Sequence, residues 1–194
     1  MNIQRICVFC ASSRQVDSNY LKAAYRLGTI LARESITVVY GGGAVGLMGE
    51  LANGAIAEGG KVIGIIPQFM YDLEWGHEEI TELKIVKDMH ERKKLVMENA
   101  DAVVALPGGS GTFDELFEAI TMKRLGFYLN PIIIVNVKGF YNPLVELLNN
   151  SIAEKFMDAR HRSMWSVVNN SEEVLDAIQN SPSWSGDARH FAAI

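Results

Sequence analysis

A cluster of glycines at residues 107–112 has the composition and position of a phosphate-binding turn. Three of the four residues from 108 to 111 are glycine, between an apolar run and a pattern of apolar residues at helical spacing. The first amides of a helix have no partner within it, and glycines let several N–H groups converge on one anion. The alternative is a tight turn that uses glycine only for its positive φ. The predicted phosphate-binding residues are Pro107, Gly108, Gly109, Ser110, Gly111 and Thr112.

One acidic residue, Glu115, shares a helix face with this turn, because it lies three residues after Thr112 and four after Gly111. Thr112 and Glu115 match the capping box, in which Ser or Thr and a later Glu satisfy amides at a helix start. The same position also places the carboxylate beside the predicted phosphate, in the binding site, although the two groups have like charge. The spacing leaves both roles open.

A short basic run at residues 89–94 contains Arg92, which could bind an anionic group. The run follows a weak strand pattern at 83–86, so it also lies at a strand end. Arginine binds a carboxylate or a phosphate through two parallel contacts, which lysine cannot reproduce. The alternative is a solvated helix face, and we assign no role to His90.

Two other predicted strand ends carry small residues. The sequence Cys10-Ala11-Ser12-Ser13 follows the first strand, and the glycine-rich residues 41–49 follow the second. The second turn suits a close approach of backbone to a sugar or base. It does not fit the dinucleotide fingerprint, which follows the first strand, and the chain has no P-loop sequence. The predicted contacts in these turns are Ser12, Ser13, Gly42 and Gly43.

Short apolar, β-branched runs alternate with amphipathic patterns along the chain. The predicted strands are residues 6–10, 36–40, 62–66, 83–86, 102–106, 132–137 and 166–168. The predicted helices are residues 20–33, 46–58, 91–99, 112–125, 143–154 and 172–178. Such alternation is typical of an α/β fold with a parallel sheet and helices on both faces. Ligands bind outside the carboxyl ends of such strands, where the candidate residues lie.

Two segments lack a regular pattern. Residues 67–79 carry Phe69, Tyr71 and Trp75, which could line a ligand pocket or pack on a partner subunit. The tail from Ser181 onward is expected to be loosely ordered or docked by Trp184. We therefore predict one nucleotide-binding domain over residues 1–180 and a C-terminal tail over 181–194.

The chain has 194 residues and a net charge of −5, without a long run of one sign. A surface that coats nucleic acid needs a basic stripe, so we expect no nucleic-acid partner. The first residues read directly into a strand, and no apolar run approaches the roughly 20 residues of a membrane-spanning helix. We therefore expect a cytoplasmic protein without a membrane partner.

The two cysteines, Cys7 and Cys10, have the C-x-x-C spacing of redox and metal sites. Residues three apart in a strand point to opposite faces, so we expect two buried, unpaired thiols. No His, Cys and Asp cluster has metal-ligand spacing, and we expect neither a metal nor a cofactor.

Four segments in the right order resemble the LONELY GUY family, the cytokinin riboside 5′-monophosphate phosphoribohydrolases, and the resemblance covers nearly the whole chain. The last segment matches the family motif P-G-G-x-G-T-x-x-E. The segments are Ile6-Cys7-Val8-Phe9-Cys10-Ala11-Ser12-Ser13, Tyr40-Gly41-Gly42-Gly43 with Gly46-Leu47-Met48-Gly49, Met89-His90-Glu91-Arg92-Lys93, and Pro107-Gly108-Gly109-Ser110-Gly111-Thr112-Phe113-Asp114-Glu115.

The resemblance implies a Rossmann-like three-layer sandwich, whose mostly parallel sheet has about seven strands, and a homodimer or higher even homo-oligomer. It implies hydrolysis of a purine nucleoside 5′-monophosphate, adenosine monophosphate with or without an N6 substituent, to free base and ribose 5-phosphate. It identifies Arg92 and Glu115 as the catalytic pair, and Met89, Lys93 and the 108–112 turn as nucleotide contacts. The family was formerly labelled lysine decarboxylase, but no segment here identifies a lysine for a pyridoxal phosphate Schiff base.

Two regions depart from the family. Ala11 stands where the family often has Gly. Residues 121–131 stand where the family commonly reads T-W-x-Q-L-G-x-H-x-K-P, a region expected near the subunit interface and the pocket wall. The replaced positions here are Met122, Arg124, Tyr128 and Asn130.

In the predicted mechanism the glycine turn holds the 5′-phosphate, and Glu115 stabilises charge on the sugar and orients water. Arg92 and the helix N-terminus are expected to keep Glu115 anionic. A carrier of a nucleotide or phosphorylated cofactor would share the glycine turns without using Glu115. A nicotinamide-dependent oxidoreductase is a further alternative, against which the missing fingerprint counts.

Overall fold

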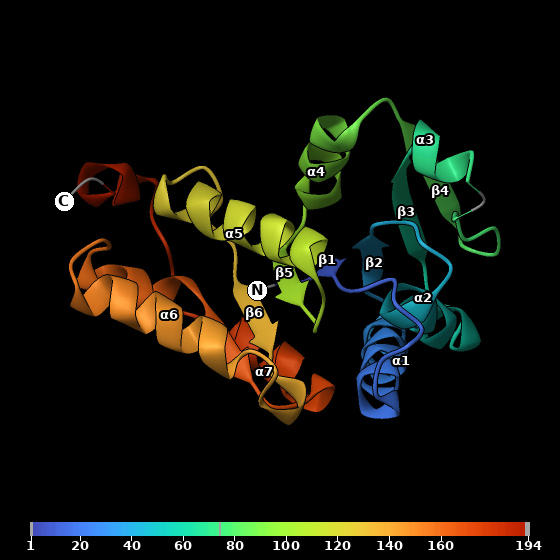
Figure 1. Cartoon of the computed structure of the whole chain (residues 1–194), viewed down its shortest axis with the longest axis horizontal. Coiled ribbons are helices and arrows are strands. Elements are labelled where there is room, and N and C mark those ends of the chain that lie inside the picture. Colours follow the sequence, from blue (N-terminus) through green and yellow to red (C-terminus); the bar gives the residue numbers. More distant parts are fainter. Residues whose placement is uncertain (1, 74, 193–194) are drawn as a thin grey trace.

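Parallel strands form the centre of the computed structural model, which describes residues 2–73 and 75–192 (Figure 1). Within these residues seven strands lie in the order β4-β3-β2-β1-β5-β6-β7, and each neighbouring pair is parallel. The predicted α/β, Rossmann-like fold is confirmed. The strands are β1 (Arg5–Phe9), β2 (Thr37–Tyr40), β3 (Val62–Pro67), β4 (Glu82–Val86), β5 (Ala102–Ala105), β6 (Ile132–Val135) and β7 (Ser166–Val168).

The strand order reverses at β1. The chain adds β2, β3 and β4 on one side of β1, and then β5, β6 and β7 on the other. Parallel α/β sheets bind ligands at such a reversal, beyond the carboxyl ends of the strands. The turns after β1 and β5 therefore border the expected crevice.

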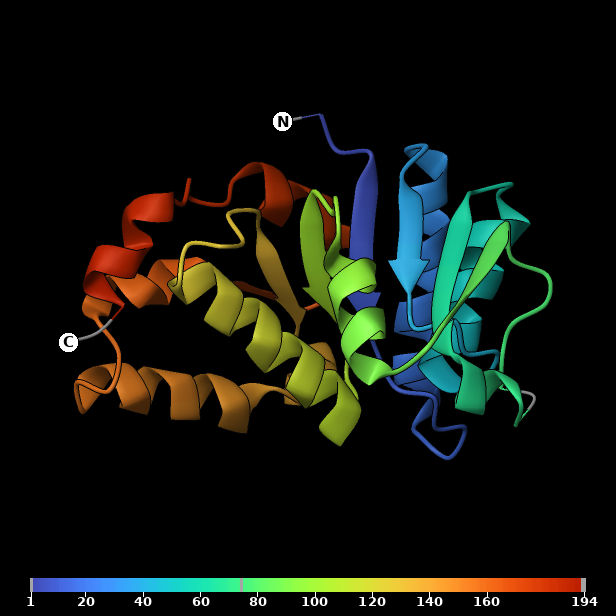
Figure 2. The same cartoon turned by 90° about the horizontal axis from the view of Figure 1, so that it is seen from above.

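Helices cover both faces of the sheet. Buried side chains of α1, α2 and α7 share one core with the strands, and those of α4, α5 and α6 share the other. Figure 2 shows α1 behind the strands and α4 in front of them. The helices are α1 (Ser18–Arg33), α2 (Gly46–Ala57), α3 (Gln68–Tyr71), α4 (Met89–Met97), α5 (Ser110–Arg124), α6 (Asn142–Ala153) and α7 (Val174–Gln179), with 3-10 turns η1 (Val137–Gly139), η2 (Ala159–Met164), η3 (Ser171–Glu173) and η4 (Gly186–Phe191).

The two cysteines lie in different cores. Cys10 packs with the α1 side of the sheet and Cys7 with the α4 side, and both are buried and free. Alternating side-chain directions in a strand separate them. The prediction of two unpaired thiols on opposite faces is confirmed.

Most predicted elements agree with the structure within two or three residues at each end. Helix α5 begins at Ser110, ahead of the predicted Thr112. Helix α4 begins at Met89, ahead of the predicted residue 91, because the side chain of Asp88 accepts hydrogen bonds from the amides of His90 and Glu91. The segment 67–79, expected to be irregular, contains the single turn α3.

The C-terminal segment is docked against the end of α5. The indole N–H of Trp184 donates to the carbonyl of Lys123 at 2.8 Å, and Arg124 donates to the carbonyl of Ala192. Of the two alternatives for the tail, docking by Trp184 is the one observed. Among the described residues, none of the helices is both long and apolar enough to cross a membrane.

Candidate active site

A cavity of about 550 Å³ opens at the carboxyl ends of β1, β2, β3 and β5. The turn after β1, the glycine-rich turn after β2, α4 and the start of α5 all contribute residues to it, as do Met70 and Trp75. Ten of the predicted site residues line this cavity. They are Ser12, Ser13, Gly43, Met89, Arg92, Gly109, Ser110, Gly111, Thr112 and Glu115.

The predicted catalytic pair is formed and buried. Arg92 Nη1 donates to Glu115 Oε1 at 2.9 Å, and the two side chains are 7% and 6% exposed. The other guanidinium nitrogens donate to backbone carbonyls, Nε to Ile65 at 3.1 Å and Nη2 to Gly41 at 3.4 Å. The guanidinium therefore joins the ends of β2 and β3 to α5, so its position is fixed from three sides.

The absence of a side chain at Gly41 leaves room for the guanidinium of Arg92. A Cβ added at Gly41 would lie 1.9 Å from Arg92 Nη2, so any larger residue would displace the guanidinium. The sequence alone did not single out Gly41 from its glycine neighbours.

The carboxylate of Glu115 does not cap its helix. The N-cap of α5 is Gly109, no side chain caps the helix start, and Thr112 lies inside the first turn. The capping-box interpretation is therefore wrong. The carboxylate is bonded to Arg92 instead, at the floor of the cavity.

Burial raises the pKa of the Glu115 carboxyl above its ordinary value, against the opposing effect of the Arg92 guanidinium. The neighbouring carboxylate of Asp114 raises it further. Desolvation disfavours the charged form of a carboxyl, and a nearby cation favours it. The expectation that Arg92 favours the anion is confirmed in direction, but desolvation is the larger effect.

The start of α5 lines the cavity with residues whose amides lie ahead of the helical hydrogen bonds. The first bond of the helix joins the amide of Phe113 to the carbonyl of Gly109 at 3.0 Å, so the amides of residues 110–112 precede the helical ladder. A Cβ built at Gly109 or Gly111 meets nothing within 4 Å, which shows open space in front of both. This arrangement suits an anion, because the helix dipole and the amides act together.

The turns after β1 and β2 touch each other. Gly46 has a φ of +63°, and a Cβ there would lie 2.5 Å from the carbonyl carbon of Ser12. The amide of Met48 donates to the carbonyl of Ala11 at 3.1 Å. This contact holds Ser12 and Ser13 at the rim, beside the start of α5.

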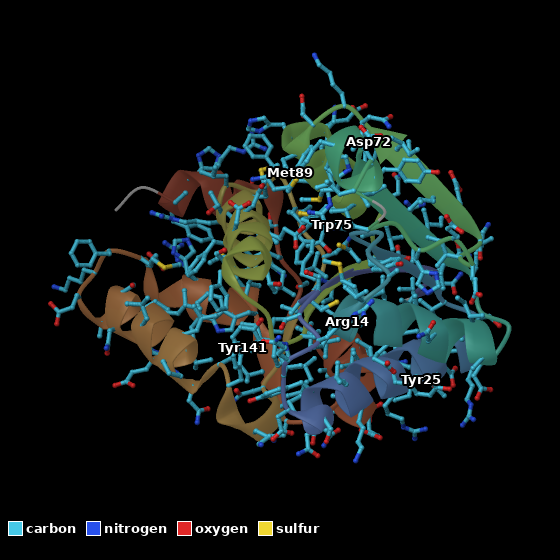
Figure 3. The ribbon with its side chains drawn as sticks, turned by 45° about the vertical axis from the view of Figure 1, so that its right-hand side comes forward. Arg14, Tyr25, Asp72, Trp75, Met89 and Tyr141 are labelled. Carbon is cyan, nitrogen blue, oxygen red and sulfur yellow. The ribbon has the colours of Figure 1, made fainter. Side chains whose placement is uncertain are left out.

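The cavity has an apolar part of its lining that the sequence did not predict in detail. The residues of this apolar wall are Met48, Ile66, Met70, Trp75 and Met89. Figure 3 shows Trp75 between α5 and α3, with Met89 nearby. Of the three aromatic residues noted in the sequence, Trp75 lines the cavity, while Phe69 and Tyr71 are not among its lining residues.

Four predicted site residues lie elsewhere. Lys93 pairs with Asp114 at 3.1 Å and Glu118 at 2.6 Å, beside a second cavity of about 380 Å³ between α4 and α5. The hydrogen bond to Glu118 raises the Lys93 pKa. Pro107 is buried, and Gly108 lies under Thr112, where a Cβ would be 2.1 Å from the threonine oxygen. Gly42, with a φ of +79°, faces Ile66 and Leu83.

No metal site is recognisable in residues 2–73 and 75–192, which contain no group of three or more His, Cys, Asp and Glu that could hold an ion. The described cavity lining contains one cation, Arg92, and one anion, Glu115. It contains no lysine, so these residues do not fit a pyridoxal phosphate Schiff base. The arrangement suits a phosphorylated ligand whose sugar lies over a buried carboxylate.

Comparison with known proteins gives two kinds of similarity. The family described as "Possible lysine decarboxylase" matches residues 48–178. The probable cytokinin riboside 5′-monophosphate phosphoribohydrolase LOG4 of Oryza sativa subsp. japonica is 41% identical over 177 residues, 91% of this chain and 76% of that protein. The cytokinin riboside 5′-monophosphate phosphoribohydrolase LOG1 of Arabidopsis thaliana is 38% identical over 177 residues, 91% of this chain and 83% of that protein.

Solved structures share the fold at lower identity. The molybdenum cofactor carrier protein of Chlamydomonas reinhardtii superposes with a TM-score of 0.71 and 19% identity, over 92% of this chain and 97% of that chain. The molybdenum cofactor binding protein of Rippkaea orientalis gives 0.69 and 22%, over 92% and 97%. At this identity the similarity shows the fold alone.

Proposed function

This chain belongs to the family described as possible lysine decarboxylases and, within it, to the LONELY GUY phosphoribohydrolases, and we propose that it hydrolyses the N-glycosidic bond of a cytokinin riboside 5′-monophosphate. The products are the free base and ribose 5-phosphate. The observation that carries the proposal is the buried Arg92–Glu115 pair, in one cavity with the amides that begin α5. The chain is thus a nucleotide N-glycosidase.

The polarity of the cavity fits a nucleotide in one orientation. The phosphate binds at residues 109–112, the ribose lies over Glu115, and the purine extends toward the apolar side. The volume of about 550 Å³ falls within the usual range for small-molecule sites. Adenosine monophosphate itself, without an N6 substituent, is part of the proposed substrate range.

The proposed mechanism depends on the positive charge that develops on the ribose during cleavage. As the bond from C1′ to the base nitrogen breaks, positive charge develops on the sugar. The Glu115 carboxylate stabilises this charge and orients a water molecule. The water oxygen bonds to C1′ and keeps one hydrogen as the new hydroxyl, while its other proton is transferred to the departing base. Arg92 holds the carboxylate in place through their 2.9 Å hydrogen bond. Phosphate binding at α5 positions the sugar, so binding energy far from the bond assists its cleavage.

A product assay tests the proposal. Purified protein is incubated with the monophosphates of adenosine, N6-isopentenyladenosine, guanosine and cytidine, and free base is measured. We expect base from the adenosine monophosphates, and much less from unphosphorylated nucleosides, which lack the anion that α5 binds. Binding of adenosine monophosphate without release of base would indicate a carrier instead.

Two further parts of the proposal concern the cell and the assembly. We propose a cytoplasmic location and a homodimer or higher even oligomer. Support for an oligomer comes from the family resemblance and from exposed apolar residues on α5 and after it, namely Phe117, Met122, Leu125, Phe127 and Leu129. Cell fractionation tests the location, and light scattering of the purified protein tests the assembly.

A further inference from the structure

Trp75 is an exposed aromatic residue that lines the candidate active site. It is 53% exposed, although tryptophan is usually largely buried. It lines the cavity together with Met48, Met70 and Met89. None of the four segments that carry the family resemblance contains Trp75, so its position calls for its own explanation.

We propose that Trp75 stacks on the base of the bound nucleotide, and that His77 is the positioning residue that holds it there. This inference rests on the proposed function, because it requires a purine nucleotide in the cavity. Stacking on an aromatic side chain uses the flat face of the base and leaves its edge free. Trp75 would therefore favour purines over the smaller pyrimidines and accept substituents at N6.

The backbone around Trp75 is tied to the glycine-rich turn after β2. The amide of Ala44 donates to the carbonyl of Trp75 at 3.0 Å, and the amide of His77 donates to the carbonyl of Gly42 at 2.9 Å. Gly43 and Gly76 form an antiparallel bridge between these two bonds. The same turn supplies the Gly41 carbonyl that binds Arg92, so Trp75 and the catalytic pair share one support.

His77 joins this segment to α2. Its side chain is buried, at 6% exposure, and Nε2 lies 3.1 Å from Asn53 Oδ1. The amide of Glu79 donates to Nδ1 at 3.3 Å, so Nδ1 carries no proton and Nε2–H donates to Asn53. Burial also lowers the His77 pKa, which favours this neutral form. The imidazole thus satisfies hydrogen bonds on both sides and fixes the backbone two residues after Trp75.

The position of Trp75 suits the base rather than the phosphate. The cavity lining includes both the start of α5, where the phosphate is proposed to bind, and the apolar side chains of Trp75 and the three methionines. Methionine side chains are flexible and make favourable contacts with aromatic rings. A purine placed there would contact sulfur and ring surface, and it would cover the exposed indole.

A binding experiment tests the role of Trp75 without requiring turnover. Titration calorimetry in the Glu115→Gln background compares adenosine monophosphate with ribose 5-phosphate, which has the same anion and sugar but no base. Adding Trp75→Ala should weaken adenosine monophosphate binding about ten-fold or more, the typical effect of losing one stacked base. Ribose 5-phosphate binding should stay within about two-fold, and Trp75→Phe should restore most of the loss.

Phe69→Ala is the matched control, because Phe69 lies on the same segment and is 51% exposed but is not among the cavity-lining residues. It should leave both ligands unaffected. Equal weakening of both ligands by Trp75→Ala, or no weakening of adenosine monophosphate binding, would overturn the stacking role. Tight binding with no release of base by the unmodified enzyme would contradict the proposed hydrolase and leave the stacking role intact.

The role of His77 is tested through its partner. Asn53 is exposed on α2, so Asn53→Ala is expected to preserve the fold. Both His77→Ala and Asn53→Ala should raise KM for adenosine monophosphate several-fold with a smaller change in kcat, and the double variant should be no worse than His77→Ala. The positioning role would be overturned if the increases in KM of the two single variants added up in the double variant. It would also be overturned if both single variants kept an unchanged KM and an unchanged thermal midpoint. His77→Gln, which keeps a donor near Asn53, should recover part of the loss.

Discussion

The two ends of α5 each carry a buried ionisable side chain, but the surroundings of the two side chains differ. Figure 1 shows the course of this helix. At the N-terminal end Glu115 bonds to Arg92 and lines an open cavity. Near the C-terminal end Lys123 is 1% exposed, donates to the carbonyl of Asn130 at 2.7 Å and lies beside the docked tail. Burial lowers the pKa of Lys123 to about 8.

The comparison shows that burial of a charge does not by itself mark a reaction site. Lys123 has a backbone carbonyl as its hydrogen-bond partner, lies at the helix end that favours cations, and is not among the residues lining either cavity. Glu115 lines a cavity, has a fixed counter-charge, and lies one turn from the proposed anion-binding amides. The combination of these features indicates catalysis, and it can be tested by changing one end of the helix at a time.

The largest expected effect comes from removing the partner of the buried charge. Arg92→Ala leaves the Glu115 carboxylate buried without a cation, which typically costs about 3 kcal/mol of unfolding free energy. It should also reduce hydrolysis by about 100-fold or more, because the carboxylate loses its fixed position. Lys123→Met replaces a buried ammonium by an apolar group of similar shape and should be neutral or stabilising. Denaturant unfolding measures the unfolding free energy of both variants, and product assays measure their hydrolysis rates. Equal losses in the two variants would contradict the distinction between the two ends of α5.

A smaller change at Gly41 should separate geometry from stability. In Gly41→Ala the added methyl overlaps Arg92 Nη2, the flexible end of a side chain, so the arginine moves while the backbone remains. We expect activity to fall about ten-fold or more, with a thermal midpoint within a few degrees of the unmodified enzyme. An unchanged kcat would show that the position of the guanidinium is not critical.

The raised pKa of Glu115 predicts the acid side of the pH profile. Hydrolysis requires the carboxylate, so kcat/KM should fall as pH drops through a pKa above the ordinary value for glutamate, about 4.3. In Glu115→Gln the glutamine side chain does not titrate, so the residual activity should not show this decrease of kcat/KM at low pH. If the same decrease persisted in the variant, the titrating group would be another residue.

The smallest effect concerns Lys123 and stability alone. Its pKa is about 8 in the folded protein, and about 10.4 is expected in the unfolded chain. Between these values the unfolded chain binds more protons, so this residue makes the unfolding free energy rise with pH. Lys123→Met should flatten the rise between pH 8 and 10.5 without changing kcat. A slope that is identical in both proteins would show that Lys123 does not titrate in that range.

The sequence predicted the strand pattern and singled out Arg92 and Glu115, which form the buried ion pair, because these predictions depend on local signals. Apolar alternation marks each strand, and the motifs around Arg92 and Glu115 are contiguous. The local spacing left a capping role for Glu115 open, because a contiguous pattern cannot show that an arginine 23 residues away binds the carboxylate. Lys93 was expected at the nucleotide, but the acidic side chains of α5 bind it outside the cavity.

The apolar wall was not predicted as a unit, because it comes from separate segments that only the sheet order brings together. The contact of His77 with Asn53 spans 24 residues and has no sequence motif. Aromatic residues on a loop were visible in the sequence, but the choice among Phe69, Tyr71 and Trp75 required the fold.

The most direct test of the central claim is the turnover number of Glu115→Gln, measured beside its affinity for adenosine monophosphate. Glu118→Gln is the matched control, because Glu118 lies one turn further along α5 and binds Lys93. We predict that Glu115→Gln lowers kcat about 100-fold or more while the Kd stays within about three-fold, and that Glu118→Gln changes kcat little. Near-normal turnover by Glu115→Gln would contradict the account.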